Sequence, residues 1–294
     1  MDTSPQFSEY VPLKDHCTLG IGGLARYFLE INTIEKMQQA ILSCQNKKIP
    51  YIILGKGSNC LFDDKGFNGA VLLNKIDFFE ESTPGTFHVG AGYSFALLGV
   101  QTARKGWEGL EFASGIPASV GGAVYMNAGA SGKEIFQVIH SVDYVTDDGI
   151  LQTIPKNEIN FSYRTSQFQK MKGAIVGATF VLQPNLEARK KQINIVNHRK
   201  NTQPYGDKSA GCIFMNPECG HAGALIEKCG LKGKNVGGAQ VSEMHANFLI
   251  NAGGATCNDM QMLIALVRQT VKEKTGIELH GEVRYIPYEM NKEK

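Results

Sequence analysis

The stretch "YIILGKGSNCLFDD", residues 51–64, joins a short apolar run to a glycine-rich loop. The run is rich in isoleucine and leucine, which predicts a buried strand. Before it, Thr33 is a predicted N-cap with Glu35 in the first turn, and apolar residues recur at helical spacing until Pro50. The order helix, strand, glycine loop therefore predicts a lobe of mixed helices and strands.

The glycine loop "GKGSN" (55–59) has two interpretations. Clustered glycines either form a tight turn or leave backbone amides open to an anion, because a side chain would block close approach. Ser58 and Asn59 add a hydroxyl and an amide, a composition suited to a diphosphate. A second run, "SGIPASVGGAVYMNAGASG" (114–132), carries almost no charge and is longer than a turn requires. We interpret it as a second wall of a cofactor site.

The remaining pattern predicts further elements. Short β-rich runs such as "TFHVGAGY", "SVDYVT" and "AIVGATFVL" indicate a second lobe. A charged helix is expected over 187–202 with Ile193 and Val196 facing inward, and another helix from near Asn258 with a glycine stop at Gly276. Its apolar stripe comprises Met260, Leu263, Ile264, Val267 and Val271. The final "IELHGEVRYIPYE" alternates as a strand does.

Composition excludes several functional classes. A net charge of +2 without a basic stripe argues against nucleic acid as a partner. No run approaches the roughly 18 apolar residues of a membrane span, and the polar first residues lack the apolar core of a secretion signal, so we expect a cytoplasmic protein. The seven cysteines are scattered without CxxC spacing, which predicts no disulfide framework and no metal site.

Common nucleotide motifs do not fit. "GIGGLA" (20–25) matches GxGxxA, but the following "RYFLEI" has the composition of a strand, whereas a Rossmann fold requires a helix there. No Walker A sequence occurs. The chain thus has phosphate-type glycine loops without either common nucleotide fold.

Six motifs, in order, carry a resemblance to a known family. "ILGKGSNCLFDD", "GLEFASGIPASVGGAVYMNAGA", "FSYRTSQF", "SAGCIFMNP", "AQVSEMHANFLIN" and "GEVRY" resemble the UDP-N-acetylenolpyruvoylglucosamine reductase family, flavoenzymes of bacterial peptidoglycan precursor synthesis. The resemblance extends from about residue 16 to residue 286. The short interval after Arg164 leaves no room for a tyrosine-bearing loop, which is similar to the loop-lacking type II subclass.

The resemblance implies an α+β fold with FAD as cofactor and NADPH as electron donor. It implies an FAD-binding lobe of the vanillyl-alcohol oxidase and p-cresol methylhydroxylase type, made of two α+β subdomains, followed by an α+β substrate-binding domain. We expect the subdomains at 1–75, completed by a C-terminal strand at 276–294, and at 76–202. The substrate-binding domain is expected at 203–275.

The implied reaction reduces an enolpyruvyl ether to a lactyl ether. It needs a hydride donor, a proton donor and a group that binds the substrate carboxylate. The resemblance assigns the carboxylate to Arg164, because a guanidinium is always charged and binds planar anions through two hydrogen bonds. Glu282 matches the family's catalytic glutamate, and Cys212 matches its proton donor, a serine in many members. A thiol titrates near about 8.5, far below an alcohol, and can supply a proton without special activation. Their structural alternatives are a surface ion pair, a strand glutamate and a buried thiol, the last being our interpretation of the other six cysteines.

The resemblance also implies binding residues. Substrate contacts are expected from Asn216, Gln240 and Lys228, although a solvated basic loop is an open alternative for Lys228 and its neighbours. The expected cofactor-binding residues are Gly55, Lys56, Gly57, Ser58, Asn59, Ser114, Gly115, Ile116, Pro117, Ser119, Val120, Gly121, Gly122, Ala123 and Asn127.

Two other functions remain open at this point. The chain could be an FAD-dependent oxidase or dehydrogenase of another small molecule, which the "SAGCIFMNP" motif argues against. It could also be a flavin-binding module without catalysis, for which Arg164, Cys212 and Glu282 would be superfluous.

Overall fold

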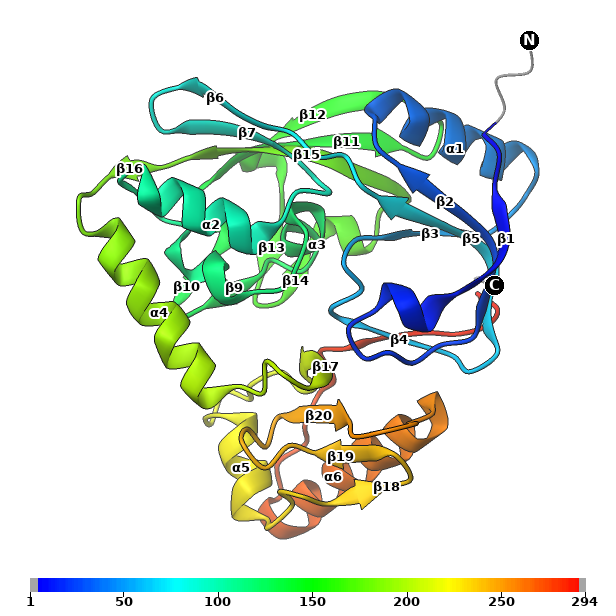
Figure 1. Ribbon diagram of the computed structural model, residues 1–294, viewed down its shortest axis with the longest axis vertical. Helices are drawn as coiled ribbons and strands as arrows, with labels where there is room; N and C mark the ends of the chain where they lie inside the picture. Colours follow the sequence, from blue (N-terminus) through cyan, green and yellow to red (C-terminus); the bar gives the residue numbers. More distant parts are fainter. Residues whose placement is uncertain (1–4, 291–294) are drawn as a thin grey trace. The chain divides into compact units, whose positions relative to one another are not determined.

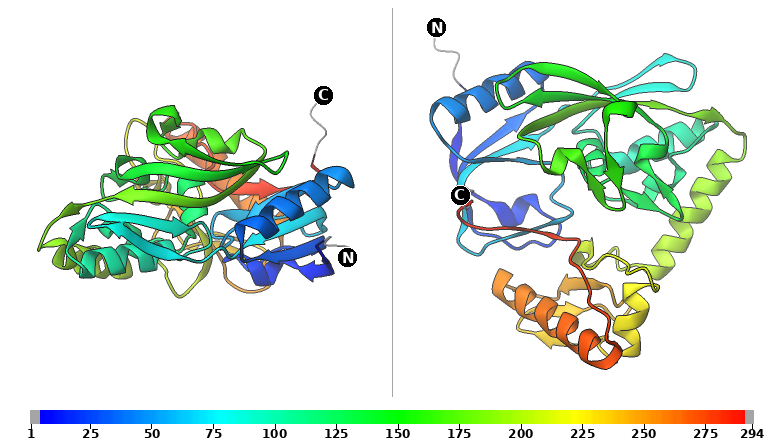
Figure 2. Two further views of the ribbon diagram at one scale, coloured as in Figure 1. Left: turned by 90° about the horizontal axis from the view of Figure 1, so that it is seen from above. Right: turned by 180° about the vertical axis from the view of Figure 1, so that it is seen from behind.

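A computed structural model describes residues 5–290 of the chain, which divides into two compact units (Figures 1 and 2). The first unit holds residues 5–8, Tyr27–Lys56 and Gly69–Arg199; the second holds Glu9–Arg26, Gly57–Asn68 and residues 200–290. Both units mix helices and strands, which confirms the predicted α+β class. The three predicted domain ranges stay predictions.

The N-terminal part of the described chain contains the predicted helix and strand. Helix α1 spans Ile34–Asn46, and its N-cap Thr33 accepts a hydrogen bond from the Lys36 N–H at 3.2 Å. Strand β3 (Tyr51–Leu54) follows, as predicted, and pairs in parallel with β5 (Gly66–Asn74) in a sheet of order β1-β2-β5-β3. Strands β1 and β2 span Ser8–Pro12 and Leu24–Ile31, so "RYFLEI" is a strand, as expected.

A five-stranded antiparallel sheet forms the centre of the first unit, in the order β12-β11-β15-β7-β6. Its two faces belong to different cores, because strand side chains alternate. Ile175 packs in one core with α2 and α3, whereas Ala174 and Val176 pack in the other with α1. The sheet is thus covered on both faces. The bounds are Leu151–Pro155 (β12), Ile139–Thr146 (β11), Gly173–Val181 (β15), Thr86–Gly90 (β7), Phe79–Thr83 (β6), Phe95–Arg104 (α2) and Val120–Tyr125 (α3).

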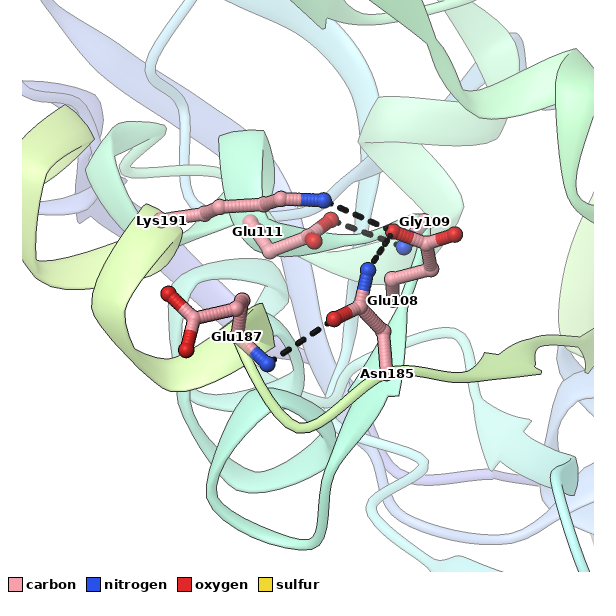
Figure 3. A network of polar contacts seen from close by, with 6 residues as sticks. All are labelled: Glu108, Gly109, Glu111, Asn185, Glu187 and Lys191. Atoms are coloured by element: carbon pink, nitrogen blue, oxygen red, sulfur yellow. Dashed lines mark hydrogen bonds and ion pairs between the residues drawn. The ribbon is translucent and has the colours of Figure 1, made fainter.

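Helix α4 (Ala188–Thr202) is fastened at its beginning by a polar network (Figure 3). Glu108, in β8 (Trp107–Glu108), accepts a 2.6 Å hydrogen bond from the Asn185 amide and a 2.9 Å bond from the Lys191 ammonium. The Asn185 Oδ1 accepts the Glu187 N–H at 2.8 Å. These contacts lower the pKa of Glu108, Lys191 having the larger effect.

The predicted inward face of α4 is wrong in part. Ile193 is 41% exposed, whereas Gln192 is 3% exposed. The helix packs through Ala188 and Gln192, which are four residues apart and share one face, so Ile193 is turned to solvent. Val196 is half-buried.

The second unit contains an antiparallel sheet of order β17-β20-β19-β18, with α5 and α6 packed in the same core (Figure 1). Helix α6 begins with a capping box between Thr256 and Asp259 and ends at Gly276, whose φ of 74° provides the predicted left-handed stop. The predicted stripe is buried, with Ile264 partly so. The bounds are Lys208–Cys212 (β17), Phe248–Asn251 (β20), Ala239–Val241 (β19), Asn235–Val236 (β18), Ala222–Lys228 (α5) and Cys257–Thr275 (α6).

The predicted C-terminal strand is shorter than its alternation suggests. Only β21 (Arg284–Ile286) forms, pairing in parallel with β4 (Cys60–Phe62). Residues 291–294 of the prediction lie outside the described part. The other short strands are Gly129–Ala130 (β9), Lys133–Glu134 (β10), Phe161–Ser162 (β13), Thr165–Ser166 (β14) and Gln183–Pro184 (β16). The 3₁₀ helices are Leu13–His16, Glu111–Gly115, Ile135–Gln137, Lys156–Glu158 and Gln167–Gln169.

Within residues 5–290, no helix has the length and apolar character needed to cross a membrane. The same residues contain no cluster of three or more His, Cys, Asp or Glu side chains that could hold a metal ion.

Candidate active site

The glycine loop leaves the end of β3 and approaches Ser119 closely. A Cβ on Gly55 would overlap the Ser119 hydroxyl, so only glycine permits this approach. Ser119 is 2% exposed and caps α3 by accepting the Gly122 N–H at 3.3 Å. The two glycine-rich stretches predicted to form a cofactor site thus meet within the first unit.

Lys56 and Ser94 extend this polar cluster. The Lys56 ammonium donates to the Ser94 hydroxyl at 2.8 Å. Ser94 is the N-cap of α2, and its backbone forms an isolated β-bridge with Ser119. Partial burial lowers the pKa of Lys56, and the positive charge of Lys75 lowers it further. A lysine beside the positive end of a helix and a second lysine is an environment that favours an anion.

Two further features of the second glycine run bear on a ligand. The Ser114 hydroxyl is buried and has no hydrogen-bond partner in the described structure, which leaves it able to bond a ligand. Gly121 N–H is already bonded to the Ala91 carbonyl at 2.8 Å. The other predicted cofactor residues of this run occupy the 3₁₀ helix Glu111–Gly115, the turn after it and α3: Gly115, Ile116, Pro117, Val120, Gly122 and Ala123.

Asn127 has a structural role that the sequence did not reveal. It is fully buried with a φ of 43°, and its amide donates to the Ser162 carbonyl at 2.9 Å and to Glu134 at 3.0 Å. Its predicted contact with a cofactor stays a prediction. What the structure shows is a tether between the residues after α3 and strand β13.

Arg164 lies at the tip of the hairpin that strands β13 and β14 form. Ser162 pairs with Thr165, so Tyr163 and Arg164 are the two loop residues. Arg164 has a φ of 56°, in the left-handed region that costs a residue with a side chain about 1–2 kcal/mol. Its guanidinium carbon lies 5.1 Å from the centre of the Tyr163 ring. An arginine where glycine or asparagine would fit without strain indicates a functional constraint.

Cys212 ends strand β17 immediately after a β-bulge. Ser209 pairs with Ile250 and Cys212 with Phe248, so this strand has one residue more than its partner. Gly211 absorbs the irregularity with a φ of 77°. Bulges re-aim the side chain that follows them and are frequent beside active sites. The half-buried Cys212 side chain is therefore placed by the backbone of its own strand.

Glu282 lies beside the residue that follows Cys212. Its N–H donates to the Ile213 carbonyl at 2.7 Å, and its carbonyl accepts from the Asn59 amide at 3.2 Å. Asn59 belongs to the glycine loop, and its own carbonyl accepts the Arg284 N–H at 3.0 Å. The second unit thus brings together Asn59, Glu282 and the strand of Cys212, whereas Arg164 belongs to the first unit.

Burial raises the thiol pKa of several of the other cysteines. Burial raises the pKa of Cys60 to about 11, of Cys257 to about 12 and of Cys44 to about 11. Raised pKa values keep thiols protonated and unreactive. The expectation that all six other cysteines are buried is wrong for Cys219, which is exposed because it lies in the turn before α5, and too strong for Cys17 and Cys60, which are half-buried.

The predicted substrate residues all belong to the second unit. Asn216 is exposed, and its side-chain oxygen accepts the Ala222 N–H at the start of α5 at 3.0 Å. Gln240 donates to the Gly233 carbonyl at 3.3 Å, and Lys228 is exposed at the end of α5. These contacts neither require nor exclude a ligand, so the three roles stay predictions.

Sequence reasoning missed the residues that position these groups. Asn247 is 2% exposed and exchanges two side-chain hydrogen bonds with the Phe214 backbone, at 3.1 and 2.8 Å, which fixes the chain just after Cys212. Gln169 donates to the Arg164 carbonyl at 3.1 Å. A polar residue inside an apolar motif, as in "HANF", was the available signal.

Comparison with known proteins gives a consistent result. Residues 203–286 match the UDP-N-acetylenolpyruvoylglucosamine reductase C-terminal domain, and residues 25–154 match an FAD binding domain. A UDP-N-acetylenolpyruvoylglucosamine reductase from Protochlamydia amoebophila is 59% identical over 286 residues, covering 97% of this chain and 96% of the relative. One from Chlamydia trachomatis serovar A is 47% identical over 282 residues, covering 96% and 97%.

A solved structure agrees with these sequences. The crystal structure of UDP-N-acetylenolpyruvylglucosamine reductase (MurB) from Thermus caldophilus matches with a TM-score of 0.82 and 34% identity. The match covers 96% of this chain and all of that one. The chain therefore belongs to the UDP-N-acetylenolpyruvoylglucosamine reductase family.

Proposed function

We propose that the protein reduces UDP-N-acetylglucosamine enolpyruvate to UDP-N-acetylmuramate with NADPH, through FAD, in peptidoglycan precursor synthesis. The observation that carries the proposal is the bulge that ends at Cys212, with Glu282 hydrogen-bonded to the next residue. A protein that only bound a flavin would need neither. Family membership supplies the substrate and cofactor.

The residues of the first unit fit the FAD diphosphate. Gly55 allows the loop to approach Ser119, Lys56 provides a positive charge at the start of α2, and the buried Ser114 hydroxyl lacks a partner among the described residues. When bound, FAD supplies the hydride transfer, from NADPH to the terminal carbon of the enol ether. The expected role of this cluster is to bind the cofactor and hold it in place.

Arg164 binds the substrate carboxylate in this proposal. When hydride adds to the terminal carbon, negative charge moves onto the carbon that bears the ether oxygen and onto the attached carboxylate. A fixed guanidinium stabilises that charge more than it stabilises the neutral double bond. The strained backbone of Arg164 supports the role, because strain persists where function constrains a residue.

Cys212 delivers the proton that completes the product. The thiol S–H bond breaks and a C–H bond forms at the carbon bearing the ether oxygen, leaving a thiolate that regains a proton from solvent. The backbone N–H of Glu282 bonds to the carbonyl of Ile213, the residue after Cys212. The expected role of the Glu282 carboxyl is to stabilise the developing enol or to return the proton. Hydride and proton together account for the two hydrogens that the product gains.

The remaining assignments complete the proposal. Asn216, Gln240 and Lys228 are the expected contacts to the sugar nucleotide, and the loop-lacking subclass stays a prediction. A cytoplasmic location is proposed from the scattered cysteines, which suit a reducing compartment.

Anaerobic half-reactions test the function. Purified holoprotein mixed with NADPH should lose its flavin colour, and the colour should return only when UDP-N-acetylglucosamine enolpyruvate is added. Recovery with oxygen but not with this substrate would contradict the proposal and would instead support an oxidase of another small molecule. Absence of bleaching would support a flavin-binding module without catalysis.

A further inference from the structure

The hairpin that carries Arg164 is tied to the end of α3 by side chains of its own segment. Ser166 donates through its hydroxyl to the Tyr125 carbonyl at 2.7 Å. Gln169 donates to the same carbonyl at 3.0 Å and to the Arg164 carbonyl at 3.1 Å. Figure 1 shows β13 and β14 beside α3, and α3 contacts β14 and the following 3₁₀ helix. The hairpin is therefore not an isolated loop.

The Gln169 side chain connects the end of α3 with the tip of the hairpin. A glutamine amide nitrogen has two hydrogens, and here one faces Tyr125 and the other Arg164. The sulfur of Met126 lies 3.6 Å from the same nitrogen. Gln169 itself follows Phe168, which is 2% exposed and packs 5.5 Å from the Tyr144 ring. The bridging amide is thus carried on a backbone that the core holds in place.

The bond to the Arg164 carbonyl acts on a strained residue. It restrains the peptide plane between Arg164 and Thr165, which is set by the ψ of Arg164 and the φ of Thr165. The φ of Arg164, at 56°, is in the left-handed region that a residue with a side chain occupies at a cost, so each restraint on this residue helps to keep it there. The direction of the arginine side chain follows its backbone.

We propose that Gln169 is a positioning residue that holds the Arg164 backbone in its left-handed conformation and so directs the guanidinium toward the substrate carboxylate. The inference rests on the proposed carboxylate-binding role of Arg164. In this proposal, Gln169 connects the end of α3, the helix of the second glycine-rich run, to Arg164, which binds the substrate carboxylate.

The competing interpretation is that Gln169 only caps α3. Tyr125 is the last residue of that helix, and its carbonyl needs a partner. Ser166 satisfies the same carbonyl without touching the Arg164 carbonyl. Gln167 lies on the same 3₁₀ helix and accepts the Asn160 N–H at 3.0 Å, away from both. These neighbours provide matched controls.

The test compares Gln169→Met, Gln167→Met and Ser166→Ala in the full-length holoenzyme. Methionine keeps the length and bulk of glutamine and removes its donors, so folding should survive. For Gln169→Met alone, the KM for the enolpyruvyl sugar nucleotide should rise about tenfold, and substrate-driven recovery of flavin colour should slow by about tenfold or more, while bleaching by NADPH stays within about twofold of wild type. Equal KM values for the three variants would overturn the proposal.

In the Gln169→Glu variant, the loss of the hydrogen-bond donor can be reversed by lowering the pH. Its carboxylate would face two carbonyl oxygens, which raises its pKa, and only the protonated form can donate a hydrogen bond. The ratio of its KM to that of wild type should therefore fall as the pH falls from 8 to 6. A ratio independent of pH would count against the bridging role.

A crystal structure of Gln169→Met separates this inference from the function itself. We expect the φ of Arg164 to leave the left-handed region in this variant and to stay there in Gln167→Met. An unchanged φ in both variants would refute the positioning role even if the reductase reaction is confirmed. If wild type shows no colour recovery with the substrate, the proposed function fails, and the φ comparison still decides whether Gln169 positions the Arg164 backbone.

Discussion

Arg164 and Cys212 are placed by opposite means in the two units. Arg164 takes the left-handed backbone itself, with a φ of 56° at the tip of a hairpin, and side chains of its own segment hold it. Cys212 lies in a strand, and the neighbouring Gly211 takes the left-handed conformation with a φ of 77°. Of these two proposed catalytic residues, Arg164 adopts the left-handed backbone itself, whereas beside Cys212 a glycine adopts it. The two should therefore respond differently to substitution.

The largest effect is expected at Cys212. Cys212→Ala should slow the recovery of flavin colour by about 10²- to 10⁴-fold while bleaching by NADPH is retained, because only proton delivery is lost. Cys212→Ser should keep measurable turnover, since a hydroxyl can still donate. Rapid mixing of each half-reaction measures both. Equal turnover of Cys212→Ala and wild type would remove the thiol from the mechanism.

Arg164→Asn should lose activity and gain stability. Asparagine tolerates the left-handed region, so the free energy of unfolding should rise by about 1 kcal/mol. Loss of the guanidinium should lower substrate-driven recovery by about 10²- to 10³-fold. Denaturant unfolding and single-turnover kinetics supply the two values. A variant that is both less stable and active would show that Arg164 carries no functional strain.

Gly211→Ala tests the other half of the comparison. Apart from Gly211 and its two chain neighbours, no described residue has an atom within 4 Å of the added Cβ, so its cost of about 1–2 kcal/mol should come from the backbone angle alone. Gly230 has a φ of 74° and equally open space, and it lies after α5. Gly230→Ala should cost the same stability. Only Gly211→Ala should slow proton delivery by Cys212, measured as the recovery of flavin colour with the substrate. Equal rates in both variants would mean that the bulge does not set the direction of the Cys212 side chain.

The smallest effect is expected at Lys56. Lys56→Met should raise the FAD dissociation constant about fivefold near neutral pH, as expected for an exposed charge of at most ~1 kcal/mol. The ammonium is present only below its pKa, which partial burial and Lys75 lower from 10.5. The difference from wild type should thus fade at a lower pH than for an ordinary lysine. Fluorescence titration against pH measures it, with Lys47→Met as the control; a constant difference up to pH 11 would contradict the assignment.

The sequence predicted local elements well because their signals are local. Thr33 and Gly276 mark helix ends through hydrogen bonding and backbone angle that each residue determines itself. The buried face of α4 was harder to predict. Ile193 is more apolar than Gln192, but the element that packs against the helix decides which of the two is buried.

The candidate site residues were proposed from motifs, but their geometry was not predictable. Tyr163 and Arg164 are not a typical turn pair, so nothing in the sequence indicates the left-handed angle. The bulge before Cys212 depends on pairing with β20, almost 40 residues later. Gln169 and Asn247 act through backbone carbonyls and amides that become neighbours only on folding.

Isotope placement in the product tests the account most directly. The reaction is run in D₂O with unlabelled NADPH, and the lactyl group is analysed by NMR. One deuterium is expected, in a single configuration, on the carbon that bears the ether oxygen, and Cys212→Ala should form this product far more slowly. A mixture of configurations at that carbon, absence of deuterium there, or an unchanged rate in Cys212→Ala would contradict the proposed proton delivery.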